Sequence, residues 1–141
     1  MHGHNYLRKL SLVDAGLSQS SIGALIEVIK TQRTLTSLDI SWNALLPNQL
    51  KGLLQVLSTN RKLQNLNLSW NNISDAQATE KDILFVGNTI GRIIKHSRTM
   101  QHIDLTGTGL GTEIIKEIGN AMRKSRALAC IHLSGNPGLT R

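Results

Sequence analysis

Residues 35–45 read LTSLDISWNAL, and residues 63–73 read LQNLNLSWNNI. The two segments start 28 residues apart and carry apolar residues at the same positions. The same pattern recurs as LRKLSLVDAGL from Leu7, MQHIDLTGTGL from Met100 and LACIHLSGNPG from Leu128. Five copies of L-x-x-L-x-L-x-x-N-x-L in one register predict a repeat protein, in which stacked units share a continuous core.

This repeat resembles the ribonuclease-inhibitor-like class of leucine-rich repeats, and the resemblance covers residues 6–136. It implies an α/β fold: a right-handed solenoid shaped as a horseshoe arc, with a parallel sheet on the concave side and helices on the convex side. We expect a single domain over residues 1–141, built from about five βα repeats that start near residues 7, 35, 63, 100 and 128.

Alternating apolar and polar residues predict a short strand in each repeat, with polar side chains facing out of the concave sheet. In LTSLDIS, for example, Leu38 and Ile40 should face the core. Across the repeats the outward positions form three columns: Lys9, Ser37, Asn65, His102 and Cys130; then Ser11, Asp39, Asn67, Asp104 and His132; then Val13, Ser41, Ser69, Thr106 and Ser134. Small polar side chains of this kind are better suited to hydrogen bonding with a protein surface than to binding an apolar ligand.

An asparagine stands where the strand ends in three of the repeats, at Asn43, Asn71 and Asn136. Its side chain can satisfy backbone groups in the turn. Ala15 and Thr108 occupy this position in the first and fourth repeats, and Ala15 has no side-chain hydrogen bond to offer. We therefore expect a looser first turn.

A helical pattern follows each strand, because apolar residues recur three and four positions apart. These residues are Ile22, Leu25, Ile26 and Ile29; Leu50, Leu53, Leu54 and Leu57; and Ile114, Ile115, Ile118 and Met122. The third repeat is nine residues longer than the others, 37 against 28, and the extra residues lie near AQATEKDIL. The insertion either prolongs the helix at its N-terminal end or forms a loop, and it either carries binding specificity or is a tolerated surface segment.

Both ends of the array lack a recognisable capping unit. The first repeat begins almost at Met1, and the fifth has a strand and a turn but stops at SGNPGLTR without a helix. Because open solenoid ends expose core edges, we expect the chain to be a segment of a longer protein, or further repeats or a partner to cover the ends.

The composition favours a soluble protein of a reducing compartment. Cys130 is the only cysteine, so no disulfide can form within the chain. No signal-like apolar run is present, and no apolar stretch approaches the roughly 18 residues of a membrane span. We therefore expect a cytoplasmic location, with the cytoskeleton or the cilium as specific sites, and no membrane partner. The net charge of +7 favours another protein with an acidic surface, ahead of nucleic acid.

Four arginines stand at one register before the later strands: Arg33, Arg61, Arg98 and Arg126. Three residues earlier, in the last turns of the predicted helices, stand Lys30, Lys95 and Arg123. Cations at helix C-terminal ends complement the helix dipole and the free carbonyl groups. The same stripe could instead dock an acidic partner, and the sequence leaves both interpretations open.

One corner of the predicted sheet gathers residues that can bind a metal. His102, Asp104, Cys130 and His132 stand on adjacent strands, about 4.8 Å apart if paired in register. They could ligate zinc or form a Cys–His nucleophile pair. Side chains of a flat sheet point in parallel, however, and no oxyanion hole or enclosing pocket is indicated. We therefore expect a polar binding face with no bound metal, no cofactor and no enzymatic activity, and keep the four residues as weak metal candidates.

Both tryptophans of the chain stand just before the turn asparagine, at Trp42 and Trp70. The equivalent residues in the other repeats are Asp14, Gly107 and Gly135, so the core does not require a large side chain there. The two indoles should be near neighbours on the rim of the sheet. They either pack against the turn of the next repeat or form an exposed binding hot spot, in which tryptophan is enriched.

The expected function is a non-catalytic protein–protein interaction scaffold within a larger intracellular assembly. By resemblance, tropomodulin-like and other cytoskeletal or ciliary repeat proteins are the favoured relatives. The alternatives are a GTPase-regulating module similar to the GTPase-activating proteins for Ran, a sensor segment of an innate immune receptor, and a basic nucleic-acid-binding surface. The expected partner-binding residues are Trp42, Trp70, Ser37, Asp39, Asn65, Asn67, His102, Asp104, His132, Arg33, Arg61, Arg98 and Arg126.

Overall fold

Strands and helices alternate along residues 6–139, the part of the chain that the computed structural model describes. The strands are β1 (Lys9–Ser11), β2 (Ser37–Asp39), β3 (Asn65–Asn67), β4 (His102–Asp104) and β5 (Cys130–His132). The helices are α1 (Gln19–Thr31), α2 (Pro47–Thr59), α3 (Glu80–His96) and α4 (Thr112–Lys124), followed by the short 3-10 helix η1 (Pro137–Leu139). None of the described helices is both long and apolar enough to cross a membrane.

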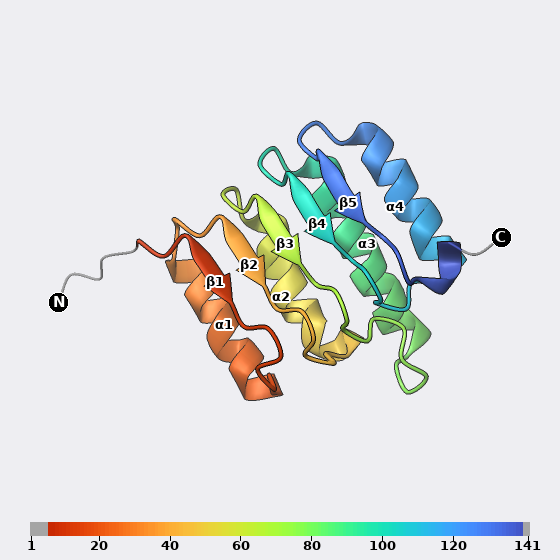
Figure 1. Cartoon of the computed structure of the whole chain (residues 1–141), viewed down its shortest axis with the longest axis horizontal. Helices are drawn as coiled ribbons and strands as arrows, with labels where there is room; N and C mark the ends of the chain where they lie inside the picture. Colours follow the sequence, from red (N-terminus) through yellow and green to blue (C-terminus); the bar gives the residue numbers. More distant parts are fainter. Residues whose placement is uncertain (1–5, 140–141) are drawn as a thin grey trace.

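The five strands form one parallel sheet in the order β1-β2-β3-β4-β5. Leu38 pairs with Leu66, and Leu66 pairs with Ile103, so the strand register follows the sequence repeat. Figure 1 shows the strands side by side, with all four helices on one face of the sheet. This arrangement confirms the predicted α/β leucine-rich-repeat solenoid.

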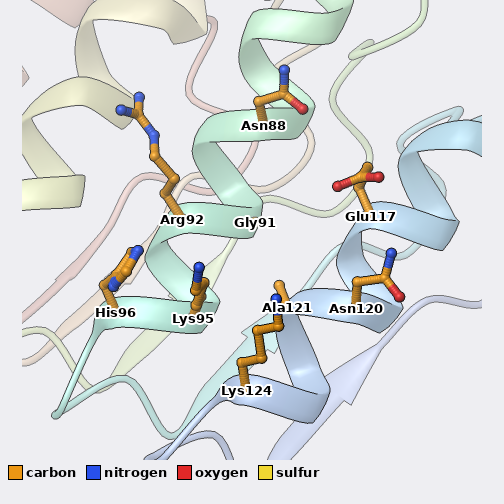
Figure 2. A pocket seen from close by; sticks show the side chains of 9 residues that line it. All are labelled: Asn88, Gly91, Arg92, Lys95, His96, Glu117, Asn120, Ala121 and Lys124. Atoms are coloured by element: carbon orange, nitrogen blue, oxygen red, sulfur yellow. The ribbon is translucent and has the colours of Figure 1, made fainter.

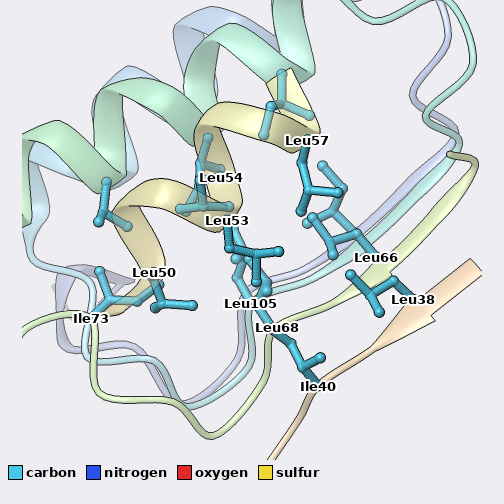
Figure 3. Packing of buried hydrophobic residues seen from close by; sticks show 14 of the residues in the cluster. Leu38, Ile40, Leu50, Leu53, Leu54, Leu57, Leu66, Leu68, Ile73 and Leu105 are labelled. Carbon is cyan, nitrogen blue, oxygen red and sulfur yellow. The ribbon is translucent and has the colours of Figure 1, made fainter. Parts of the chain in front are cut away.

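The core lies between the sheet and the helices. Leu38, Leu66 and Ile103 of the central strands are each 1% exposed. Figure 3 shows Leu38 and Leu66 facing the buried leucines of α2. Each such side chain contributes roughly 1.5–3 kcal/mol to stability through burial. Leu10 and Ile131, on the outer strands, are only partly buried because each outer strand has a single neighbour.

The apolar face of α4 differs from the prediction at one position. Ile114 and Ile118 are buried as expected, but Met122 is 38% exposed and Ala121 is buried in its place. Ala121 lies next to α3, since a Cβ added to Gly91 would be 3.9 Å from the Cβ of Ala121. Two small residues at this contact let the helices approach closely.

The insertion in the third repeat both lengthens the helix and adds a loop. α3 has 17 residues where α1, α2 and α4 have 13 each, so the helix gains four residues (17 − 13). The rest enters the loop before α3, which protrudes beyond the other turns in Figure 1. The Thr79 side chain caps the helix by accepting a hydrogen bond from the Asp82 N–H at 3.1 Å.

The turn asparagines join neighbouring repeats. The buried Asn71 side chain donates to the carbonyl oxygens of Ile40 and Leu68, at 3.1 and 3.0 Å. Its Oδ1 accepts a hydrogen bond from the Leu45 N–H at 3.0 Å. Three backbone groups from two repeats are therefore satisfied by one side chain, as proposed for this position.

The turns of the two repeats that lack this asparagine are also held by side-chain hydrogen bonds. Asn43 Oδ1 accepts from the Ala15 N–H at 3.0 Å, so the first turn is held by the second repeat despite its alanine. Thr108 donates its hydroxyl to the Leu105 carbonyl at 2.8 Å and lies 3.1 Å from Asn136 Oδ1. A short hydroxyl therefore replaces the amide in the fourth repeat.

Candidate partner-binding surfaces

The sheet brings the predicted concave residues together on one face. Cα pairing aligns the first two outward columns as expected. The central residues are partly exposed, namely Ser37, Asp39, Asn65, Asn67, His102 and Asp104, while His132 on the last strand is exposed. The side chains of these residues present hydrogen-bonding groups without a large apolar anchor.

Part of the second column also stabilises the ends of the strands. Asp39 Oδ1 accepts from the N–H and the hydroxyl of Ser41, at 3.0 and 2.7 Å. Asn67 Oδ1 does the same for Ser69, at 2.9 and 2.6 Å. Asp104 Oδ1 accepts from the N–H two residues later at 2.9 Å. These residues therefore hold the turn and retain only their remaining polar atoms for a partner.

This bonding corrects the prediction that the whole third column faces out. Ser41 and Ser69 are 3% and 5% exposed, because their hydroxyl groups turn back to the second column. Val13, in the first repeat, is exposed as predicted. The spacing of Asp or Asn two residues before Ser was present in the sequence and carries this signal.

Trp42 and Trp70 stack on each other and remain exposed. Their ring centroids are 4.7 Å apart with an interplanar angle of 21°, and the residues are 55% and 43% exposed. Trp70 also covers Gly107 of the next repeat, where an added Cβ would be 2.5 Å from the ring. The indoles therefore pack along the repeats, as one of the two interpretations expects, and still offer apolar surface; the binding hot spot stays a prediction.

The backbone at these tryptophans is left-handed. Trp42 has φ 60° and Trp70 has φ 56°, while Gly107 and Gly135 adopt similar angles at the same position. A residue with a Cβ costs roughly 1–2 kcal/mol in this conformation, and bulky residues are rare there. Such local cost is characteristic of functional positions. We name this exposed, strained pair the tryptophan pair.

The four predicted arginines are exposed along one edge of the solenoid, in the loops that lead from each helix to the next strand. Consecutive arginines line shared hollows: Arg33 with Arg61, Arg61 with Arg98, and Arg98 with Arg126. The hollows are also lined by Lys30, Lys62, Lys95 and Lys124. We name these eight residues the basic edge.

The basic edge carries an excess of positive charge. In residues 6–139 the ion pairs are Lys30–Glu27, Lys51–Asp82 and Lys116–Glu113, so none of the four arginines is paired with a carboxylate. Figure 2 shows the adjoining hollow, where Arg92 and Lys95 project from α3 and Glu117 and Lys124 from α4. This edge can therefore attract an acidic surface.

The concave face ends in a cluster of imidazole and thiol groups. His102, Cys130 and His132 have ligand atoms that all lie within 4.8 Å of one another. Cys130 Sγ is 3.6 Å from His132 Nε2, and the two imidazole centroids are 4.9 Å apart. Three of the four metal candidates thus converge, contrary to the expectation of parallel side chains. Asp104 is outside this group, and its Oδ1 is engaged by the Thr106 N–H.

Comparison with known proteins agrees with the repeat architecture. A leucine-rich-repeat family model matches residues 31–46, 59–76 and 96–119, and no curated protein sequence matches the chain. The C-terminal domain of tropomodulin from Caenorhabditis elegans is similar in structure, with a TM-score of 0.73 and 14% identity, over 93% of this chain and 75% of that one. Leiomodin-1 actin-binding site 2 gives a TM-score of 0.69 and 12% identity, over 89% and 69% of the two chains. The matched segments and the five strand-and-turn units show that the chain is built from leucine-rich repeats.

Proposed function

We propose that this protein is a non-catalytic interaction scaffold that binds a cytoskeletal protein through its concave face and the adjoining strand-end rim. The tryptophan pair carries the proposal. Trp42 and Trp70 expose apolar surface from a left-handed backbone that glycine would adopt at lower cost. Stacking and the contact with Gly107 account for part of each indole, and a contact made on binding would account for the apolar surface that stays exposed.

Actin is the partner to test first. One structural neighbour is an actin-binding site of leiomodin-1, and another is the tropomodulin C-terminal domain. At 12% and 14% identity these neighbours share the fold, and they supply a defined probe for the proposed function. With a partner of this kind, we propose a cytoplasmic location for the protein.

The experiment measures binding of monomeric actin to the immobilised chain by interferometry. The double variant Trp42→Ala/Trp70→Ala should weaken binding by at least about 30-fold, the equivalent of one 2 kcal/mol hot spot. Leu84→Ala is the matched control, because Leu84 is 44% exposed on α3, outside the concave face. Equal affinity of the double variant and the parent chain would exclude the tryptophan pair as the contact. No binding of actin by the parent chain would exclude actin as the partner.

The basic edge supports a second contact, with an acidic segment of the same partner. Arg61 and Arg98 line one hollow, so replacing both with glutamate reverses the charge at its centre. We expect Arg61→Glu/Arg98→Glu to weaken actin binding and to flatten its salt dependence. Lys81→Glu/Lys116→Glu, at exposed positions of α3 and α4 outside the basic edge, is the control with the same change in charge. If the salt dependence of actin binding were unchanged, these arginines would only complement the dipoles and free carbonyl groups at the helix C-terminal ends.

A short DNA duplex distinguishes the nucleic-acid alternative. A protein that neutralises several phosphates loses affinity steeply as salt rises, with a slope of about −0.9 per phosphate in a plot of log K against log salt. We expect only weak duplex binding, because the stacked tryptophans lie on the strand-end rim and not among the basic-edge residues. Tight duplex binding that Arg61→Glu/Arg98→Glu abolishes would replace the protein-scaffold proposal.

A further inference from the structure

The last two strands of the concave face place three metal-ligating side chains on one side of the sheet. His102 on β4 is the Cα partner of Cys130 on β5. His132 follows Cys130 by two residues and therefore lies on the same face. The register alone brings the three together, and their ligand atoms lie within 4.8 Å of one another.

The separation of two of these atoms fits a tetrahedral zinc site. With Zn–S near 2.3 Å and Zn–N near 2.0–2.1 Å, tetrahedral geometry places sulfur and nitrogen about 3.5 Å apart. Cys130 Sγ and His132 Nε2 are 3.6 Å apart. The imidazole of His102 meets that of His132 edge-on, with 4.9 Å between centroids, so its side chain has to rotate to bring a nitrogen to the third corner.

From this geometry we propose that His102, Cys130 and His132 bind a zinc ion. Two imidazoles and one thiolate form a donor set that suits zinc, whereas magnesium and calcium prefer oxygen ligands. Cys130 and His132 are exposed and His102 is partly exposed, so the ion can enter from solvent. On binding, the Cys130 thiol releases its proton to the buffer and its sulfur coordinates as thiolate. The fourth position takes a water molecule.

The test is a titration of the complete chain with Co²⁺, followed by displacement with Zn²⁺, under reducing conditions. His2 and His4 are replaced by alanine in every protein, so that no imidazole near the N-terminus competes. We expect one equivalent of Co²⁺, a near-ultraviolet thiolate-to-metal charge-transfer band, and loss of both on addition of Zn²⁺. A spectrum without the charge-transfer band, or the absence of Zn²⁺ binding by calorimetry, would overturn the proposal.

Single variants assign the ligands. We expect His102→Ala, Cys130→Ser and His132→Ala each to weaken Zn²⁺ binding by at least the roughly 10–100-fold that loss of an outer-shell partner costs. His96→Ala is the control, because His96 is an exposed histidine at the end of α3, away from the sheet. Circular dichroism of the metal-free variants verifies that the fold is kept. If His96→Ala weakened binding as much as His102→Ala, the ion would not be held by this cluster.

Discussion

The indole ring of Trp70 lies against the backbone of Gly107, so close that a Cβ added at Gly107 would be 2.5 Å from ring carbon Cε3. Trp42 stacks on Trp70, with 4.7 Å between ring centroids. Three consecutive repeats are therefore linked along the rim of the sheet by contacts outside the main core. The glycine in the fourth repeat gives Trp70 the room to lie there.

Gly107→Ala should displace this ring. Both Gly107 and Gly135 have positive φ, so alanine at either position carries the cost of a left-handed backbone, about 1–2 kcal/mol. At Gly135 the nearest atoms to an added Cβ are 3.5 Å away, so only Gly107→Ala also collides with an indole. We expect Gly107→Ala to lose about 1 kcal/mol more than Gly135→Ala in urea unfolding, and to change the near-ultraviolet circular dichroism. Equal losses with unchanged dichroism would mean that the stack moves aside freely.

Trp42→Gly should be more stable than Trp42→Ala. Both substitutions remove the stacking with Trp70, but only glycine adopts φ 60° without a Cβ penalty. We expect a difference of about 1 kcal/mol in the free energy of unfolding, opposite to the usual preference for alanine. Ala129→Gly, in the extended segment before β5, is the control and should destabilise. A more stable Trp42→Ala would show that the loop relaxes to another backbone conformation.

Asn71→Ala should be among the most destabilising single changes in a turn. It leaves the Leu45 N–H without its acceptor and removes the donor from the carbonyls of Ile40 and Leu68. We expect a loss of about 3 kcal/mol, since each buried unsatisfied group costs about 1–3 kcal/mol. The exposed neighbour Asn72 supplies the control, because Asn72→Ala should change stability by less than about 0.5 kcal/mol. Chemical denaturation of both variants measures the contrast, and similar losses for the two would argue against the bonding described.

The Asp82 carboxylate should titrate below the usual range of aspartate. Its hydrogen bond to Lys51 Nζ, at 3.0 Å between α3 and α2, lowers the pKa of Asp82, and the bond with Thr79 lowers it further. The folded-state pKa is depressed, so the stabilisation is present at neutral pH and is lost as the pH falls through that pKa. NMR titration should show Lys51→Met raising the pKa of Asp82 more than Lys81→Met does, since Lys81 acts only through a weaker coulombic effect. An equal pKa of Asp82 in the two variants would show that the hydrogen bond from Lys51 is not the main cause of the lowered pKa.

The repeat register could be predicted because it depends on spacing alone. Leu38, Leu66 and Ile103 recur at fixed positions in their repeats, and the parallel sheet pairs them as the sequence indicates. Asn71 could likewise be assigned to the turn, because a short amide at a strand end has few other uses.

The side-chain geometry could not be predicted from spacing. Ser41 is buried because its hydroxyl turns to Asp39, an orientation that alternation along a strand does not determine. Cys130 and His132 converge through rotamer choice, although the strand directions alone would keep them parallel. The stacking of the tryptophan pair depends on a left-handed backbone, which the residue type itself disfavours.

The asparagine hydrogen bonds also set an order in which the turns of the solenoid can form during synthesis. The N–H of Ala15 donates a hydrogen bond to Asn43, 28 residues later, and the N–H of Leu45 donates one to Asn71, 26 residues later. Each turn therefore receives its acceptor from the repeat that follows it. On the ribosome, a finished strand would wait for the next unit to emerge before its own turn could close, so the array matures one repeat behind its synthesis.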